Sequence, residues 1–403
     1  MRYQRSAEWL AYARQVTPGA SQTRSRSQEH FPEGSFPAFL DAGNGCYVWD
    51  RDGNKYIDWI MGLASVTLGY AHPAITKALD AATGRIGLSL PTTLEARLAE
   101  RLCQVIPCAE SVRFVKTGSE ATEAAMRIAR VETGRDKIVS IGYHGWHSVH
   151  DAAKREHPGV PAALTSTIYD MPYNVLPVLD ETPYAAVIIE PTLIEPPFDG
   201  YLQEIRDRCT KTGTVLIFDE IVTGYRWALG GGQEYFNVKP DLACFGKAMG
   251  NGVPIACVVG GRDLMKHAWY VSSTSGGDAL GLAAASAVLD VYETEDVVTR
   301  LWQVGTLFQA GFKQIARAGF GIEGYPVHPK IVSHSRGREG LMLFLQETAS
   351  RGVLFHGAGF NTSIAHTDAD VHYTLEVCNE AFEAIDKGAV LKGTVAPERF
   401  KRA

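Results

Sequence analysis

Short apolar runs alternate with helical patterns between about residues 61 and 290, and this rhythm limits the possible folds more than any other feature of the chain. Strands that alternate with helices form a mainly parallel sheet covered by helices on both faces. The expected strands are Ser111 to Lys116, Lys137 to Ile141, Ala185 to Glu190, Val215 to Asp219, Leu242 to Phe245 and Ile255 to Val259. The region therefore predicts an α/β domain, whose ligands would gather at the carboxyl ends of the strands.

The N-terminal region, residues 1–60, departs from this rhythm because it is rich in loops that contain Pro and Gly. Within this arm, Asp52-Gly53-Asn54 predicts the turn of a hairpin over Gly45 to Asp58. The large α/β domain then occupies residues 61–290. The chain has 403 residues and is 45% hydrophobic, which is ample for cores in two or more domains.

The C-terminal region, residues 291–403, predicts a separate small α+β domain. An amphipathic helix is expected over Val297 to Ala318. A last helix is expected near Asp368 to Lys387, with Thr367 or Asp368 as its cap. The expected fold is therefore an N-terminal arm, a large sheet domain and a small C-terminal domain.

The charge balance argues against two classes of partner. Lys and Arg number 39 against 45 Asp and Glu, a net charge of −6, which gives no electrostatic case for nucleic acid or a membrane surface. Met1 to Arg14 lack the apolar stretch of a signal peptide, and no run approaches the roughly 18 apolar residues of a membrane span. The seven cysteines are scattered without a CxxC pair. We therefore expect a soluble cytoplasmic protein.

Lys247 and Asp219 are the strongest candidates for chemistry. Lys247 lies in a glycine-rich turn, and Asp219 ends an apolar run. A pyridoxal-phosphate (PLP) enzyme needs a lysine that holds the cofactor as a Schiff base and a carboxylate that keeps the pyridine nitrogen protonated. Lys247 could instead be an ordinary surface lysine or a phosphate-binding lysine, and Asp219 could instead cap a helix. The turn lacks P-loop spacing.

A phosphate site is expected where the strand at Ser111 to Lys116 gives way to a helix. Gly118 and Ser119 lie at this start, where free backbone N–H groups, a hydroxyl and the helix dipole favour an anion. The alternative is that Ser119 only caps the helix. The hydroxyl- and glycine-rich stretch from Tyr270 to Gly277 also suits phosphate, although such stretches are usually loops.

An aromatic and histidine-rich loop follows the strand at Lys137 to Ile141. Tyr143 at this strand end could stack on a flat heterocycle. His144, His147 and His150 are spaced three apart, which raises a metal site as an alternative. Gly145 interrupts a helical arrangement and no carboxylate pattern completes the set, so no metal is expected.

Together these segments resemble the class III aminotransferases, which are fold-type I PLP enzymes, and within them the glutamate-1-semialdehyde aminomutase-like branch. The resemblance runs from about residue 17 to residue 386. It is carried by six matches in order: Gly69-Tyr70-Ala71-His72-Pro73, Phe114 to Ala121, Tyr143-His144-Gly145, Pro172-Tyr173-Asn174, Ile217 to Arg226, and the Lys247 turn. Six ordered matches are far more specific than any one of them.

The resemblance implies a role for each residue at a matching position. Lys247 would hold PLP and move a proton at the substrate carbon, and Asp219 would pair with the pyridine nitrogen. The implied cofactor contacts are Gly118 and Ser119 to the phosphate, Tyr143 and Ile221 to the two ring faces, and Asn174 to the ring hydroxyl. Thr274 would reach the phosphate of the neighbouring subunit, which implies a homodimer with a shared active site.

The chain departs from the aminomutase pattern around the implied substrate site. Arg26 falls on the arginine that binds substrate carboxylate in the aminomutase, and Arg24 is an extra cation nearby. Guanidinium groups suit carboxylate and phosphate, although both arginines could instead be solvated loop residues. Met61 to Ser65 replace a Gly-Ser-Trp-Gly-Pro stretch, so an aromatic wall of the substrate site is lost.

The chain matches the aminomutase pattern at the cofactor site but differs from it at the substrate wall, which favours a PLP-dependent aminotransferase. It would move an amino group from a small-molecule donor, glutamate by default, to a keto or aldehyde acceptor such as a keto sugar or another anionic carbonyl compound. The alternative is an intramolecular aminomutase of the glutamate-1-semialdehyde type. A non-catalytic relative would be expected to lack Lys247 or Asp219, and this chain has both.

Overall fold

The computed structural model describes residues 2–152, 158–317 and 319–396. The chain divides into two compact units, one made of Met1–His72 with Thr299–Lys401 and the other centred on Pro73–Val298. The two segments of the first unit lie far apart in the sequence. Each unit is described by itself below.

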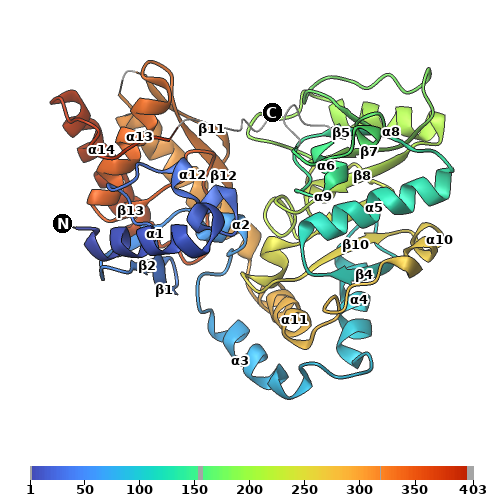
Figure 1. The fold of residues 1–403 in the computed structure, drawn as a ribbon. Helices are drawn as coiled ribbons and strands as arrows, with labels where there is room; N and C mark the ends of the chain where they lie inside the picture. Colours follow the sequence, from blue (N-terminus) through green and yellow to red (C-terminus); the bar gives the residue numbers. More distant parts are fainter. Residues whose placement is uncertain (1, 153–157, 318, 397–403) are drawn as a thin grey trace. The chain divides into compact units, whose positions relative to one another are not determined.

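The unit centred on Pro73–Val298 is built on a seven-stranded sheet in the order β4-β10-β9-β8-β7-β5-β6 (Figure 1). Its strands run parallel from β9 through β8, β7 and β5 to β6, and β10 is antiparallel to both β9 and β4. The strand bounds are β4 Ser111–Val115, β5 Lys137–Ile141, β6 Ile168–Asp170, β7 Tyr184–Ile189, β8 Val215–Asp219, β9 Leu242–Phe245 and β10 Ala256–Gly260. The expected mainly parallel sheet is confirmed, and β6 is an additional edge strand.

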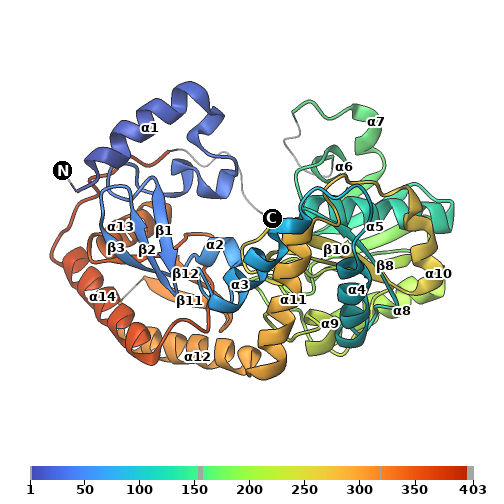
Figure 2. The same ribbon diagram turned by 90° about the horizontal axis from the view of Figure 1, so that it is seen from below.

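The central strands are buried on both faces. Every residue of β8, β9 and β10 is buried, as expected for apolar runs inside a sheet covered by helices on both sides. Right-handed crossovers require opposite faces for α5 Gly118–Thr133, which leads from β4 to β5, and α8 Tyr201–Thr212, which leads back from β7 to β8. Figure 2 shows these two helices on opposite sides of the sheet.

Further helices complete this unit. They are α3 Pro73–Ala82, η4 Thr83–Arg85, α4 Thr93–Val105, α6 Ser148–Asp151, α7 Ala162–Thr165, α9 Gly232–Tyr235, η5 Lys247–Gly250, α10 Arg262–Met265, η6 Lys266–Tyr270 and α11 Ala279–Thr294. The helix expected after β4 is α5, which Gly134 ends in a left-handed conformation.

The other unit joins the N-terminal residues to the C-terminal region. Its four-stranded sheet has the order β1-β2-β3-β13, and β11 pairs with β12 in a separate hairpin. The expected hairpin is confirmed as the antiparallel pair β2 and β3. The bounds are α1 Gln4–Val16, η1 Pro18–Ala20, η2 Arg24–Arg26, η3 Gln28–His30, β1 Leu40–Asn44, β2 Tyr47–Asp50, β3 Lys55–Asp58, α2 Met61–Ala64, β11 Phe320–Tyr325, β12 His328–Ser333, α13 Gly337–Ser350 and β13 Val353–Leu354.

Two long helices in the C-terminal region were expected from the sequence. The first is α12 Val297–Ile315, and Ala318, where we expected it to end, lies outside the described residues. The second is α14 Asp368–Asp386, whose N-cap is Thr367 in a reciprocal capping box with Asp370. Aromatic rings dominate the core between them, with Trp59 stacked on His366 and 4.8 Å from Phe308 between ring centroids.

None of the helices in the described ranges is long and apolar enough to cross a membrane.

Candidate active site

The candidate chemistry lies at the carboxyl edge of the seven-stranded sheet. Strands β5, β7, β8 and β9 run parallel, so their carboxyl ends meet at one edge. Asp219 is the last residue of β8, and Lys247 follows the end of β9 by two residues. The loop that contains Tyr143 leaves the end of β5. The topology therefore brings three of the expected cofactor contacts to one edge, as open α/β sheets do with their ligands.

Asp219 is a buried acid with a specific partner. Its side-chain Oδ2 lies 2.8 Å from Nδ1 of His144, and both side chains are almost fully buried. Its Oδ1 accepts the backbone N–H of Ile221 at 3.1 Å. A buried carboxylate is costly without such donors. Turns rather than a helix follow β8, so the alternative of Asp219 as a helix cap does not describe its place in the fold.

His144 is the residue that the sequence did not single out for this role. The sequence suggested it only as part of a motif and of a histidine series, since 75 positions separate it from Asp219. A histidine that donates from Nδ1 to a carboxylate is fixed in orientation and tautomer. Two clues together could have identified it. His144 directly follows β5, in Tyr143-His144-Gly145, and the strand order separates β5 from β8 by only one strand, β7.

Glu220 holds the segment that follows Asp219. It is fully buried and accepts the backbone N–H groups of Gly232 at 2.7 Å and Gln233 at 2.8 Å. Burial raises the pKa of Glu220 to about 7, and hydrogen bonds from Thr223 and from these amides oppose the rise. Glu220 thus fastens the chain after β8 to the start of α9, next to Asp219 at the end of β8.

The start of α5 is a cradle for an anion. The N-cap is Thr117, whose side chain accepts the N–H of Glu120 in a capping box, so the alternative that Ser119 caps the helix is wrong. Within the described residues, no hydrogen bond occupies the backbone N–H groups of Gly118 and Ser119. Two open amides at the N-terminus of a 16-residue helix suit a phosphate group.

The loop after β5 packs directly on this cradle. A Cβ atom at Gly145 would lie 2.4 Å from Oγ of Ser119 and 3.0 Å from its Cα, and Gly145 has a φ of +132°. The backbone N–H of Tyr143 donates to Oε1 of Glu190 at 2.8 Å, which ties the loop to the end of β7. The contact brings Tyr143 and His144 onto the same edge as Ser119.

Alanine at Gly145 is expected to weaken PLP binding about 10-fold, because the new Cβ must push the loop away from Ser119. The measurement is PLP affinity by titration of the cofactor-free protein. Gly134→Ala is the matched control, since Gly134, directly after α5, also has a positive φ but a Cβ there meets no atom within 4 Å. Equal affinities for the two variants would contradict the packing argument.

Ile221 lies between two glycines that flank the expected cofactor contacts. A Cβ at Gly118 would be 3.0 Å from Cδ1 of Ile221, and a Cβ at Gly246 would be 3.1 Å from the same atom. Lys247 follows Gly246 with a φ of +45°, which is unusual for a residue other than glycine. The start of α5, Ile221 and the lysine turn are therefore adjacent, as the resemblance implied.

Asn174 and Thr274 are placed differently from this group. The amide nitrogen of Asn174 donates to Oε1 of Glu195 and to the carbonyl of Pro196, and its oxygen accepts the N–H of Phe198. These bonds clamp one loop to another. Thr274 lies exposed in the loop before α11, where the neighbouring Ser273 hydroxyl is 3.4 Å from Glu120. The roles of Asn174 and Thr274 with the cofactor stay predictions.

The residues expected to contact substrate belong to the other unit. Arg24 and Arg26 are exposed in η2, and Arg24 forms an ion pair with Glu29 at 3.4 Å. Met61–Ala64, at the altered substrate wall, have positive φ angles between +45° and +72°. Such a run is strained for residues other than glycine. The buried carboxylate of Asp58 supports it by accepting the N–H groups of Ile60 and Met61.

The arrangement fits the cofactor that the resemblance implied. A buried acid suits the pyridinium nitrogen of PLP, open helix-start amides suit its phosphate, and Lys247 lies in the adjacent turn. All of these groups belong to the unit centred on Pro73–Val298.

Comparisons with known proteins bear on the same residues. The family model described as "Aminotransferase class-III" matches residues 30–366. A glutamate-1-semialdehyde 2,1-aminomutase of Desulforamulus reducens is 33% identical over 96% of this chain and 99% of its own length. Another, of Syntrophobacter fumaroxidans, is 34% identical over 87% of this chain and 91% of its own length.

Solved structures agree on the fold. The PLP internal aldimine form of the FumI protein of Sphingopyxis sp. MTA144 superposes with a TM-score of 0.88 at 26% identity, over 95% of this chain and 97% of that chain. A glutamate-1-semialdehyde-aminomutase of Pseudomonas aeruginosa PAO1 superposes with a TM-score of 0.82 at 22% identity, over 95% of both chains. These likenesses confirm the fold-type I PLP architecture.

Proposed function

Because this chain belongs to the class III aminotransferase family and has PLP as its cofactor, we propose that it moves an amino group on a small carbonyl or amino compound with Lys247 as the catalytic residue. The observation that supports this most is the placement of Lys247 and the His144–Asp219 pair at one sheet edge. When bound, PLP supplies an electron sink for the negative charge that develops on the substrate carbon.

The protein residues would position this chemistry and handle its proton. Lys247 Nζ would hold the cofactor between turnovers and, once released, would move a proton at the substrate carbon. The Asp219 carboxylate would accept the pyridinium N–H, and His144 would keep that carboxylate oriented. The amides of Gly118 and Ser119 would hold the phosphate. Tyr143 and Ile221 would pack on the two ring faces, which excludes water from the reacting carbon.

Two reactions are compatible with this machinery. The sequence favoured a two-substrate aminotransferase, but the names of the curated relatives, at 31–34% identity, support the intramolecular aminomutase better, and we place it first. The second candidate rests on the substrate wall, where Met61–Ala64 form a strained segment in place of the aromatic stretch of the aminomutase.

One experiment separates the two reactions. Purified protein is given glutamate-1-semialdehyde alone, and the amino-shifted isomer is measured with no keto acid added. Isomerisation by catalytic amounts of protein is the expected result. If instead L-glutamate removes the yellow absorption band of the cofactor and 2-oxoglutarate restores it, with no isomerisation, the aminotransferase reaction replaces the first proposal.

Arg26 is proposed to bind an anionic group of the substrate. It is exposed, and no ion pair occupies its guanidinium within the described part of the chain, whereas Arg24 is paired with Glu29. Arg26→Ala is expected to raise KM about 10-fold or more with little change in kcat, since a charge-assisted hydrogen bond contributes about 1.5–3 kcal/mol. Arg51→Ala, which breaks an exposed pair with Asp41, is the control. An unchanged KM would remove Arg26 from the site.

We also propose a homodimer in which Thr274 of one subunit reaches the phosphate bound to the other. The exposed position of Thr274 is compatible with this role. Solution scattering with an activity assay at the same protein concentration tests it. A fully active monomer would exclude the shared site.

A further inference from the structure

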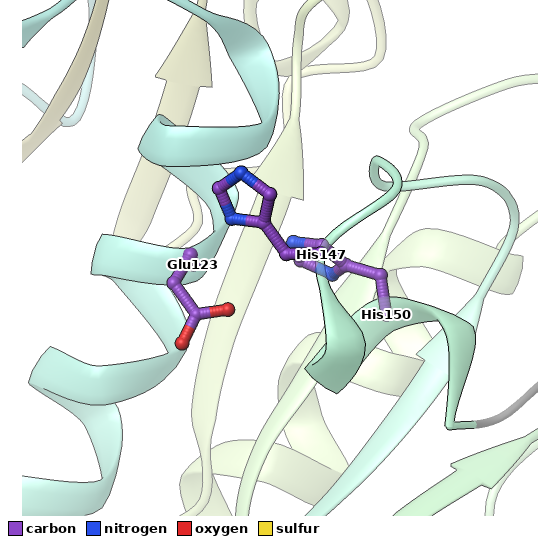
Figure 3. Close-up of side chains that lie close together, drawn as sticks. All are labelled: Glu123, His147 and His150. Atoms are coloured by element: carbon purple, nitrogen blue, oxygen red, sulfur yellow. The ribbon is translucent and has the colours of Figure 1, made fainter. Parts of the chain in front are cut away.

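A carboxylate and two imidazoles converge next to the candidate active site, and no part of the proposed reaction uses them. Glu123 lies on α5, His147 lies directly before α6, and His150 lies within α6. One ligand atom from each residue lies within 4.8 Å of the others, and Figure 3 shows the three side chains directed toward one another. We propose that Glu123, His147 and His150 bind a divalent transition-metal cation.

The donor set determines the class of cation. Two imidazole nitrogens and one carboxylate oxygen are ligands that Zn²⁺ and its neighbours Co²⁺ and Fe²⁺ accept, whereas Mg²⁺ and Ca²⁺ prefer oxygen alone. Three protein ligands leave further positions for water. Three ligand atoms bonded to one ion at about 2.0–2.2 Å in tetrahedral geometry lie about 3.4 Å apart, so side chains separated by up to 4.8 Å would move inward on binding.

The histidine series in the sequence had suggested a different set. His144 is spaced like His147 and His150, but its Nδ1 lies 2.8 Å from Oδ2 of Asp219. The carboxylate that seemed to be missing comes from α5, more than 20 positions earlier in the chain. The structure therefore replaces His144 by Glu123 in the candidate set.

Among the described residues, no ion pair within 4.0 Å involves the half-buried carboxylate of Glu123. Burial raises the pKa of Glu123, and the charges of His147, Arg130 and Arg127 oppose this rise. The guanidinium of Arg127 lies over the Tyr270 ring at 4.5 Å, and Nε of Arg130 donates to the Asp136 carbonyl at 2.9 Å. Both arginines are directed elsewhere, so a bound cation would compensate a half-buried carboxylate.

A neighbouring hydroxyl links the cluster to the cofactor loop. Oγ1 of Thr122 lies 3.1 Å from Nε2 of His150 and donates to the carbonyl of His144 at 2.6 Å. Such contacts orient an imidazole that binds metal. A cation held between α5 and α6 would therefore brace the loop that carries Tyr143 and His144 against the helix whose start forms the phosphate cradle. The role we assign is structural support of the site.

The test uses the PLP-loaded protein, freed of excess cofactor and metal. Equilibrium dialysis against Zn²⁺ is expected to give one tightly bound equivalent, and Co²⁺ in its place should give visible absorption bands typical of nitrogen and oxygen ligands. Glu123→Gln and His147→Asn are each expected to weaken Zn²⁺ binding at least about 10-fold. Anomalous scattering from a crystal soaked with Zn²⁺ would locate the ion.

Glu132→Gln is the matched control, because Glu132 also lies on α5 and faces an imidazole, His267, at 2.8 Å, but only one. Its Zn²⁺ affinity should equal that of the unchanged protein. Absence of a bound equivalent, or equal loss in the control and in Glu123→Gln, would overturn the proposal. Metal binding is measured without substrate. A negative result would therefore count against the metal site alone and would leave the proposed amino transfer untouched.

Discussion

Replacing Lys247 by alanine is expected to lower kcat by about 10⁴-fold or more, which corresponds to about 5.5 kcal/mol of lost transition-state stabilisation. The side chain would hold the cofactor and move the proton, and water supplies neither function efficiently. The strained backbone at Lys247, with a φ of +45°, is consistent with a residue held in place for chemistry rather than for packing. The fold itself should be unaffected, since the side chain is only half-buried.

Two quantities are measured: kcat, and the covalent attachment of the reduced cofactor to Lys247. Borohydride reduction of the PLP-loaded protein, followed by peptide mass analysis, should add the phosphopyridoxyl mass to the peptide that contains Lys247 and to no peptide of the Lys247→Ala variant. Lys266→Ala, at an exposed lysine of the same unit, is the control and should keep both activity and labelling. Labelling of a different lysine in the unchanged protein would contradict the assignment of Lys247.

The sheet could be predicted almost strand by strand because its central strands are buried on both faces. Runs such as Val215 to Asp219 are continuously apolar, and such a run between helical patterns has few other interpretations. The edge strand β6, Ile168–Asp170, was missed because two of its three residues are exposed and its pattern is that of a loop. The helix α1 was missed because only Ser6 and Leu10 on it are buried.

The candidate site was predictable where neighbours in sequence are neighbours in space. Gly118 and Ser119 are consecutive at the start of α5, and Gly246 and Lys247 are consecutive just after β9. The pair of His144 with Asp219 was not predictable from spacing, since strand order alone brings them together. Glu123 was also missed, because it precedes β5 in the chain whereas His147 and His150 follow that strand.

Replacing Asp219 by asparagine is expected to lower kcat by about 10³-fold, within the range in which a positioned acid or base contributes. Asparagine keeps the shape but not the charge, so the pyridinium N–H would lose its ionised partner inside a buried site. His144 acts through Asp219, and His144→Asn is therefore expected to cost less, about 10- to 100-fold. Bound PLP, measured in the same samples, separates loss of cofactor from loss of catalysis.

The double variant decides whether the two residues act as one unit. If His144 works only by orienting the carboxylate, the double variant should be about as slow as Asp219→Asn alone, because nothing remains to be oriented. Asp241→Asn is the control: Asp241 precedes β9 at the amino edge, where it binds Arg206 at 2.8 Å and the N–H of Leu216 at 2.7 Å. That change should lower stability and leave kcat unchanged. Effects of Asp219 and His144 that simply multiply would show that His144 has a role of its own in the reaction.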